Sequence, residues 1–146
     1  NGKPVDLGKI KDVAAFTAAG QRLVEQYNAY EVLGEHINGE FTLGENIGDL
    51  AGLAIAHDAY VKSLDGREAP VIDGTTGDQR FFLGWAQVWR RNYRDANLLQ
   101  RLTTDPHSPS MQRAWVVRNI DSWYNAYGVQ PGARLYLTPE QRVRIW

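Results

Sequence analysis

The sequence predicts a mainly α-helical fold. Its apolar residues recur at the three- and four-residue spacing of amphipathic helices, and no stretch alternates strictly between apolar and polar positions as a half-buried strand would. The chain has 146 residues, 43% hydrophobic and 11% aromatic, which suits one domain with a buried core. Glycine-rich and polar stretches separate the helical segments. We therefore expect about four to five helices joined by long loops.

The first predicted helix runs roughly from Lys9 to Tyr30, with an apolar stripe that includes Ile10, Val13, Phe16, Leu23, Val24 and Tyr27. The stretch EVLGEHINGEF then breaks the pattern with glycines that suit turns. The second predicted helix starts at Thr42 and continues to about Leu64. Thr42 and Glu45 match a capping box, in which a Thr hydroxyl and a Glu three residues later each satisfy a free backbone amide.

Two more helices follow the loop DGREAPVIDGTTGD. The third spans roughly Asp78 to Tyr93 and carries Phe81, Phe82, Trp85, Val88 and Trp89. After TTDPHSPS, a fourth helix is expected with Ser108 as its cap and Pro109 at its first position, running to about Tyr127 before a stop at Gly128. The terminal LTPEQRVRIW repeats the cap pattern with Thr138 and Pro139.

Composition excludes several classes of function. The formal net charge of −1 is shared among 16 basic and 17 acidic residues without a long run of either sign, so we expect no nucleic-acid partner. No stretch approaches the about 18 apolar residues that a membrane span needs, and the N-terminus lacks a signal-peptide pattern. The absence of cysteine excludes disulfides and thiolate metal sites without settling the compartment. Because the chain starts at Asn1, we expect a fragment or a processed chain.

Two carboxylates in TLGENIGDLAG raise the central question about function. Glu45 and Asp49 lie four residues apart, and like charges at that spacing destabilise an isolated helix by about 0.2 to 0.5 kcal/mol. A capping role explains Glu45 alone, and a surface Lys or Arg is a simple partner for Asp49. Alternatively, both carboxylates lie at a dry contact where a divalent metal and an imidazole neutralise them.

A stripe of small residues favours the dry contact. Gly44, Gly48, Gly52 and Ala56 recur every four residues, although glycine inside a helix costs roughly 1 kcal/mol relative to alanine. The stripe therefore predicts a second helix lying very close.

The chain does not supply a complete zinc site by itself. A catalytic zinc usually takes three protein ligands and a water, but His36, His57 and His107 form no HxxxH pair. On one helix, His57 and Glu45 would lie about 120° apart around the axis. Two ligands are therefore missing.

Four motifs together resemble the C-terminal part of the neprilysin family of zinc metallopeptidases: INGEFTLGENIGDLAGLAIAHDAY, FFLGWAQVWRRNYR, TTDPHSPSMQR and TPEQRVRIW. The resemblance covers nearly all of residues 1–146 in family order, and it implies a helical portion of a zincin-type (gluzincin) catalytic domain. In that family, two histidines of an HExxH helix and a third ligand in ENxxD hold the zinc, and the HExxH glutamate is the general base.

The resemblance assigns roles to four residues of this chain. Glu45 is similar to the third zinc ligand, and Asp49 to the carboxylate that accepts a hydrogen bond from a zinc-bound histidine. His107 resembles the histidine that stabilises the tetrahedral oxyanion, and Arg113 the arginine that holds a substrate backbone carbonyl. In addition, Asp105 is a candidate to orient His107.

The chain departs from the family pattern in one serious respect, because it contains no HExxH. Leu50 and Ala51 also replace Asn and Gly of some members, and we assign no chemistry to Asn46. We therefore expect the chain alone neither to hydrolyse peptides nor to hold zinc tightly.

Its expected partners are a peptide substrate, the upstream HExxH segment of the same polypeptide, and a second copy through the exposed glycine face. Localisation outside the cytoplasm, whether periplasmic, secreted or as a membrane-anchored ectodomain, follows from the resemblance alone.

Two alternatives to an active peptidase stay open. The first is a helical binding module without metal, in which Glu45 caps a helix, the glycine stripe packs against a partner, and four tryptophans serve the core or an interface: Trp85, Trp89, Trp115 and Trp123. The second is an inactive homologue whose upstream histidines or glutamate are replaced. The sequence that precedes Asn1 would separate all three.

Overall fold

The computed structural model describes residues 11–145, and these residues are mainly helical, as predicted. In chain order the elements are α1 (Lys11–Asn28), β1 (Glu31–Val32), β2 (Glu35–His36), α2 (Gly39–Ser63), α3 (Gly77–Val88), α4 (Asp95–Thr104), α5 (Ser110–Ala114), the 3₁₀ helix η2 (Trp115–Asn119) and α6 (Asp121–Tyr127). The two strands form one antiparallel hairpin. None of the helices in this range is long and apolar enough to cross a membrane.

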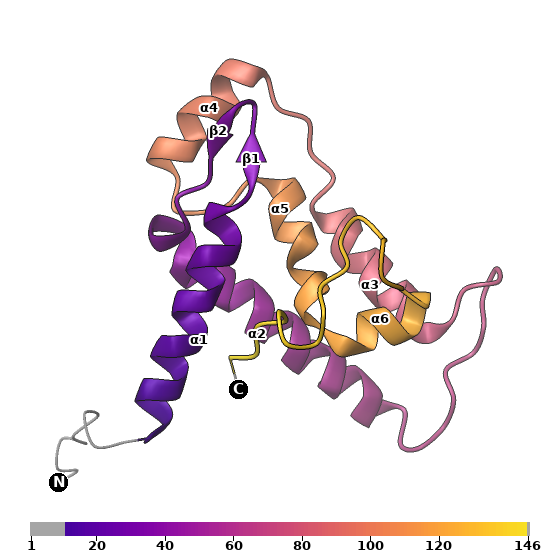
Figure 1. Cartoon of the computed structure of the whole chain (residues 1–146). Helices are drawn as coiled ribbons and strands as arrows, with labels where there is room; N and C mark the ends of the chain where they lie inside the picture. The colour runs from indigo at the N-terminus through magenta and orange to yellow at the C-terminus, as the bar shows by residue number, and fades with distance from the viewer. Residues whose placement is uncertain (1–10, 146) are drawn as a thin grey trace, which may run out of the picture.

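The long helix α2 is the element on which the others assemble (Figure 1). Helix α1 packs against its first half, η2 packs against it farther along, and α3 lies beside α6. The hairpin, the start of α2 and α4 meet at one end, where they line a common hollow. The buried core comes from all of these segments and includes Leu23, Tyr27, Leu53, Phe82, Val116 and Val143.

The start of α2 differs from the prediction. Asn38, not Thr42, caps the helix, because its side-chain Oδ1 accepts a hydrogen bond from Phe41 N at 2.9 Å. The predicted capping box of Thr42 and Glu45 is therefore wrong. Thr42 lies buried one turn inside the helix, and its hydroxyl donates to the Asn38 carbonyl at 3.0 Å.

Gly39 sets how closely α1 and α2 approach. A Cβ at this position would lie 2.3 Å from the Val24 carbonyl oxygen of α1, so no larger residue fits there without a shift. The predicted start of α1 at Lys9 lies outside the described residues. Its end is at Asn28 rather than Tyr30, because a hairpin follows whose turn residues Leu33 and Gly34 have φ of 53° and 86°.

The middle of the chain contains one helix that was not predicted. Helix α3 is capped by Thr76 and ends at Val88, five residues before the predicted end at Tyr93. Helix α4 then begins at Asp95. None of its residues is fully buried and no side chain caps it, so its sequence signal is weak. The four-residue spacing of Leu98 and Leu102, which pack against the core, is the one sequence signal that could have indicated it.

The predicted helix from Ser108 to Tyr127 is divided into three pieces. Pro109 has extended backbone angles and precedes α5, so it is not the first helical residue. The chain is extended again at Ile120, between η2 and α6. The predicted stop at Gly128 is confirmed, because this glycine adopts the left-handed conformation with φ of 59°. Thr138 and Pro139 start a turn rather than a helix.

Asp121 attaches the C-terminal tail to the start of α6. Its two carboxylate oxygens accept hydrogen bonds from Arg142 Nη1 at 2.8 Å and Arg144 Nη2 at 2.5 Å. Between these arginines, the buried Val143 donates its backbone N–H to Asn119 Oδ1 at 2.9 Å. The hydrogen bond from Arg142 lowers the pKa of Asp121, burial acts in the opposite direction, and Arg144 lowers the pKa further.

Asp121→Asn is expected to destabilise the chain at pH 7 by less than about 1 kcal/mol, because the carboxylate is half exposed and solvent screens the pairs. A carboxyl whose pKa is lower when folded stabilises the fold above its unfolded pKa of about 3.9, and this contribution is lost as the pH falls through the folded pKa. The variant and the wild type should therefore differ in urea unfolding at pH 7, and the difference should shrink as the pH falls below about 3.9. Asp58→Asn, at an exposed position of α2, is the control, and a pH-independent difference would contradict the prediction.

Candidate active site

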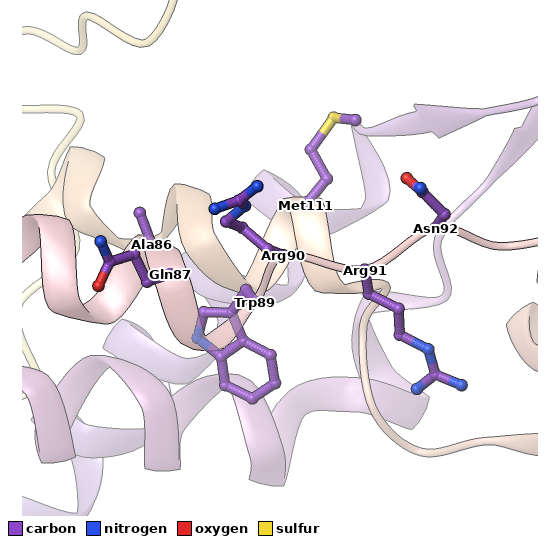
Figure 2. A pocket seen from close by; sticks show the side chains of 7 residues that line it. All are labelled: Ala86, Gln87, Trp89, Arg90, Arg91, Asn92 and Met111. Atoms are coloured by element: carbon purple, nitrogen blue, oxygen red, sulfur yellow. The ribbon is translucent and has the colours of Figure 1, made fainter.

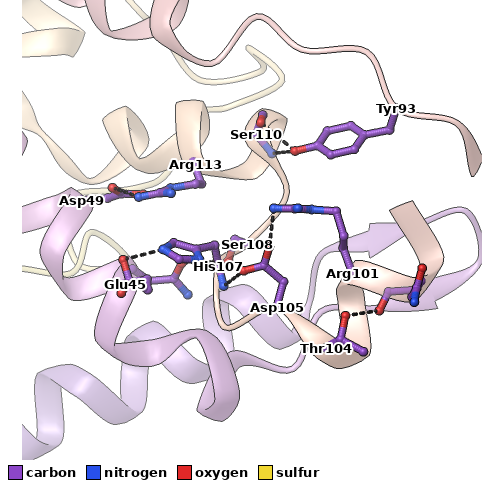
Figure 3. A network of polar contacts seen from close by, with 12 residues as sticks. Glu45, Asp49, Tyr93, Arg101, Thr104, Asp105, His107, Ser108, Ser110 and Arg113 are labelled. Carbon is purple, nitrogen blue, oxygen red and sulfur yellow. Dashed lines mark hydrogen bonds and ion pairs between the residues drawn. The ribbon is translucent and has the colours of Figure 1, made fainter. Parts of the chain in front are cut away.

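The two carboxylates of α2 lie one turn apart in different environments. The side chain of Asp49 is 7% exposed and faces α5, whereas that of Glu45 is 45% exposed and lies at the edge of the packed face. Each carboxylate contacts a different partner, His107 for Glu45 and Arg113 for Asp49 (Figure 3). These partners offset the repulsion between the two negative charges.

Asp49 forms a bidentate ion pair with Arg113 of α5. Arg113 Nε and Nη2 each donate to one oxygen of Asp49 at 2.7 Å. The guanidinium also lies over the Trp89 ring, with Cζ 4.0 Å from the ring centroid. Burial lowers the pKa of Arg113, but the hydrogen bond and charge of Asp49, with the charge of Glu45, outweigh it and raise the pKa overall. Asp49 does reach an arginine, as one alternative held, but that arginine is largely buried.

His107 lies in the loop between α4 and α5 and has carboxylates on both sides. Its Nε2 is 3.1 Å from Glu45 Oε2, and its Nδ1 is 2.7 Å from Asp105 Oδ1. The same Asp105 oxygen accepts the backbone N–H of His107 at 3.0 Å. Both ring contacts are hydrogen bonds at once only when each ring nitrogen carries a proton. The contact between Asp105 and His107 agrees with the suggestion that Asp105 orients the ring.

Asp105 is itself held by Arg101 of α4, which contacts its other oxygen, Oδ2. Burial raises the pKa of Asp105. Hydrogen bonds from the backbone and ring of His107, together with the positive charge of Arg101, act against burial and leave the pKa below its ordinary value. Asp105 is therefore an anionic acceptor at neutral pH.

Asn46 connects the histidine loop to α2, a role that sequence reasoning missed. Its side chain is 1% exposed, its Oδ1 accepts a hydrogen bond from Ser108 Oγ at 2.8 Å, and its Nδ2 donates to Thr42 Oγ1 at 2.9 Å. Because a buried amide needs partners for both of its ends, this arrangement attaches the loop at one position. The only signal in the sequence was that Asn46 lies between the two carboxylates.

The structure brings together all four residues that sequence analysis selected. Glu45, Asp49, His107 and Arg113 come from α2, the loop after α4, and α5, and they lie in one polar network (Figure 3). Within residues 11–145, no group of three or more His, Cys, Asp or Glu side chains has an arrangement that could hold a metal ion. The half-exposed carboxylate of Glu45 is suited to act as one oxygen ligand to a metal held jointly with other groups.

A hollow of about 660 Å³ lies beside this network and is lined by Ala86, Gln87, Trp89, Arg90, Arg91, Asn92 and Met111 (Figure 2). Trp89 connects the hollow to the network, because it lines the hollow and its ring also lies under the guanidinium of Arg113. The four tryptophans considered for a binding module are all partly buried. Trp85, Trp115 and Trp123 pack against the core, and Trp85 also contacts Trp89 edge to face, with ring centroids 5.3 Å apart.

The glycine stripe of α2 faces away from the rest of the described chain. Gly44, Gly48 and Gly52 are exposed, and a Cβ built on any of them meets nothing within 4 Å. Ile55, on the same side, is 61% exposed. The close helix contact within residues 11–145 is therefore at Gly39 and not at the stripe. Self-association through the stripe stays a prediction.

Comparison with known proteins identifies the family. The sequence model of peptidase family M13 matches residues 1–143. Endothelin-converting enzyme 1 of Cavia porcellus is 38% identical over 142 residues, and neprilysin-3 of Drosophila melanogaster is 31% identical over 141 residues. These matches cover 94% and 93% of this chain but only 19% and 18% of the relatives, so the chain spans about a fifth of their length.

A solved structure supports the same family. The crystal structure of Mycobacterium tuberculosis zinc metalloprotease ZMP1 in complex with an inhibitor has a TM-score of 0.93 and 49% identity, and the match covers 97% of this chain and 23% of that one. The chain therefore belongs to peptidase family M13, the neprilysin family, whose members are zinc metallopeptidases. The resemblance that the four motifs indicated is confirmed.

Arg113→Ala is expected to lower the free energy of unfolding by about 3 kcal/mol, because it leaves the Asp49 carboxylate buried without a counter-ion. The double variant Asp49→Leu, Arg113→Met should recover most of this loss, since both charges are then gone. Urea unfolding of the wild type and the variants measures both effects. Arg90→Ala, at an exposed position, is the matched control. A loss below about 1 kcal/mol in Arg113→Ala would mean that water solvates the pair.

Proposed function

We propose that residues 1–146 are the C-terminal part of a neprilysin-like catalytic domain that hydrolyses peptide bonds with zinc-activated water. The observation that carries the proposal is the network in which Glu45 contacts His107 and Asp49 pairs with Arg113, at the edge of a helix whose outer face is apolar and uncovered. Family membership supplies the chemistry, because zinc bound in such a domain polarises the scissile carbonyl and activates water.

In this proposal Glu45 is the third zinc ligand and the upstream segment supplies HExxH. The Glu45 carboxylate lies on the same side of α2 as Gly48 and Gly52, where nothing in the described chain covers the helix. Glycine at these positions allows another helix to approach closely. A second helix on this face would place its histidines beside Glu45 and would cover the exposed apolar surface.

Asp49 can serve two partners in the assembled site. Its two oxygens each accept one hydrogen bond from Arg113 in the described chain, but a carboxylate has about four acceptor positions. An imidazole N–H from the upstream segment can therefore share the carboxylate with Arg113. Such a contact would fix the tautomer and orientation of a zinc-bound histidine, as the resemblance implies.

His107 and Arg113 are the proposed substrate-binding groups. The hydrogen bonds of Arg113 to Asp49 use Nε and Nη2, so within residues 11–145 its Nη1 has no acceptor and can donate to a substrate backbone carbonyl. His107 Nε2 points toward Glu45, so a proton on this nitrogen faces the place where negative charge would develop on the scissile carbonyl. Peptide substrates and a location outside the cytoplasm follow from the resemblance.

In the full-length parent protein, Glu45→Ala is expected to abolish stoichiometric zinc binding and zinc-dependent peptide hydrolysis, because one of three protein ligands is removed. His107→Ala should retain zinc and lower kcat about 100- to 1,000-fold with KM nearly unchanged, as for the loss of one oxyanion donor. Glu40→Ala, at an exposed position in the first turn of α2, is the control. Full activity in Glu45→Ala would overturn the role of Glu45 as a zinc ligand, and a parent without HExxH would favour an inactive homologue or a binding module.

The isolated chain is expected to bind zinc more weakly than micromolar, since residues 11–145 contribute only one of the proposed ligands. Calorimetric titration of zinc into the chain tests this expectation directly. A micromolar or tighter affinity that disappears in Glu45→Ala would contradict it. The same affinity retained in Glu45→Ala would indicate a metal site elsewhere in the chain.

A further inference from the structure

Arg101 is the side chain of α4 that contacts Asp105, the partner of His107, and the family resemblance gave it no role. It lies in the last turn of α4, four residues before Asp105, a spacing at which side chains on a helix meet. Helix α4 ends at this point, where Asp105 N donates to the Arg101 carbonyl at 3.0 Å. Arg101 and Asp105 are therefore joined through both backbone and side chain.

Asp105 has a separate partner for each carboxylate oxygen. Oδ1 accepts from the ring Nδ1 and the backbone N–H of His107, at 2.7 Å and 3.0 Å, while Oδ2 contacts Arg101 (Figure 3). The final torsion of an aspartate is soft and roughly two-fold, so bonds to one oxygen alone leave the carboxylate plane poorly defined. The contact with Arg101 defines that plane and leaves Oδ1 for the histidine.

Arg101 is also held from its other side. Its guanidinium lies 5.8 Å from the centroid of the Tyr93 ring, and the Tyr93 hydroxyl is hydrogen-bonded to Ser110 Oγ at 2.8 Å. Ser110 is the first residue of α5, the helix that carries Arg113. The side chain of Arg101 is 31% exposed, so it is more confined than an ordinary surface arginine. Its position therefore depends on the same helix that supports the Asp49–Arg113 pair.

We propose that Arg101 is a positioning residue, which acts through Asp105 to hold the His107 ring with Nε2 directed toward Glu45. This inference rests on the proposed peptidase function, since orientation of His107 matters for catalysis only if His107 contacts the reacting carbonyl. Arg101 itself touches no reacting atom. Its removal should therefore affect the catalytic step and leave substrate binding and the fold nearly unchanged.

The kinetic test uses the full-length parent protein with Arg101→Ala, Arg101→Lys and the matched control Gln100→Ala, an exposed neighbour on α4. Arg101→Ala should lower kcat about 10-fold with KM within about twofold, a size typical of groups that orient a catalytic side chain. Arg101→Lys should recover most of the loss because it keeps the charge. In a His107→Ala background, Arg101→Ala should cause no further loss.

The outcomes separate this inference from the proposed function. A parent that hydrolyses peptides and loses activity in His107→Ala, but is unaffected by Arg101→Ala, would overturn the role of Arg101 and leave the function standing. Losses that multiply in the double variant would also overturn it. A parent without zinc-dependent hydrolysis would overturn the function and, with it, any catalytic role of Arg101.

A second measurement on the chain itself does not depend on activity. Proton NMR should detect a slowly exchanging Nδ1–H of His107 in the wild type and in Arg101→Lys, because Asp105 accepts that proton. The signal should broaden or disappear in Arg101→Ala. An unchanged signal in Arg101→Ala would show that Asp105 holds the ring without Arg101, and would overturn the inference.

Discussion

The ion pair between Asp49 and Arg113 is the contact on which the arrangement of the site depends. Two largely buried charges are stable only as partners with good geometry, and this pair makes two hydrogen bonds of 2.7 Å. It joins residues 64 positions apart in the sequence, on α2 and α5. Because the guanidinium and the carboxylate are both planar, two parallel bonds define distance and orientation together. Glu45 lies one turn from Asp49 on α2. The ion pair therefore also fixes the position of Glu45 relative to α5.

A second set of contacts, some neutral and some charged, determines the position of the loop that carries His107. Residues 105–109 form no regular secondary structure, yet Ser108 is bonded to the buried Asn46 and His107 to Asp105. A buried amide must satisfy both of its ends, so the loop has one favourable position on α2. The ion pair therefore positions Arg113, and the contacts of Asn46 and Asp105 position the loop and ring of His107.

Helix α2 has apolar residues on its outer side as well as on its inner side. Its inner side carries Asn46, Asp49 and core leucines, and its outer side carries exposed glycines, Phe41 and Ile55. Apolar residues on two sides of a helix are typical of an element that has neighbours on both sides. In the proposed function that second neighbour is the upstream segment, and Glu45 lies at the boundary between the two surfaces. A neighbour on the outer side would also explain the exposed glycines of α2, which make no close contact within residues 11–145.

Sequence alone determined the helical class, the family and the four residues of the network, because these depend on local spacing and on ordered motifs. It also predicted the left-handed stop at Gly128, which needs only one residue's conformational freedom. It misplaced the cap of α2, because Asn38 and Thr42 are both good caps and only packing of Gly39 against α1 decides between them. It missed α4, which buries no residue fully. Arg101, Asp105 and His107 are close in the sequence, but only the structure shows how their side chains are directed. Tertiary structure alone decided that Asp49 pairs with Arg113 and that Asn46 bonds to Ser108, because these partners are 64 and 62 positions apart and meet only when distant segments fold together.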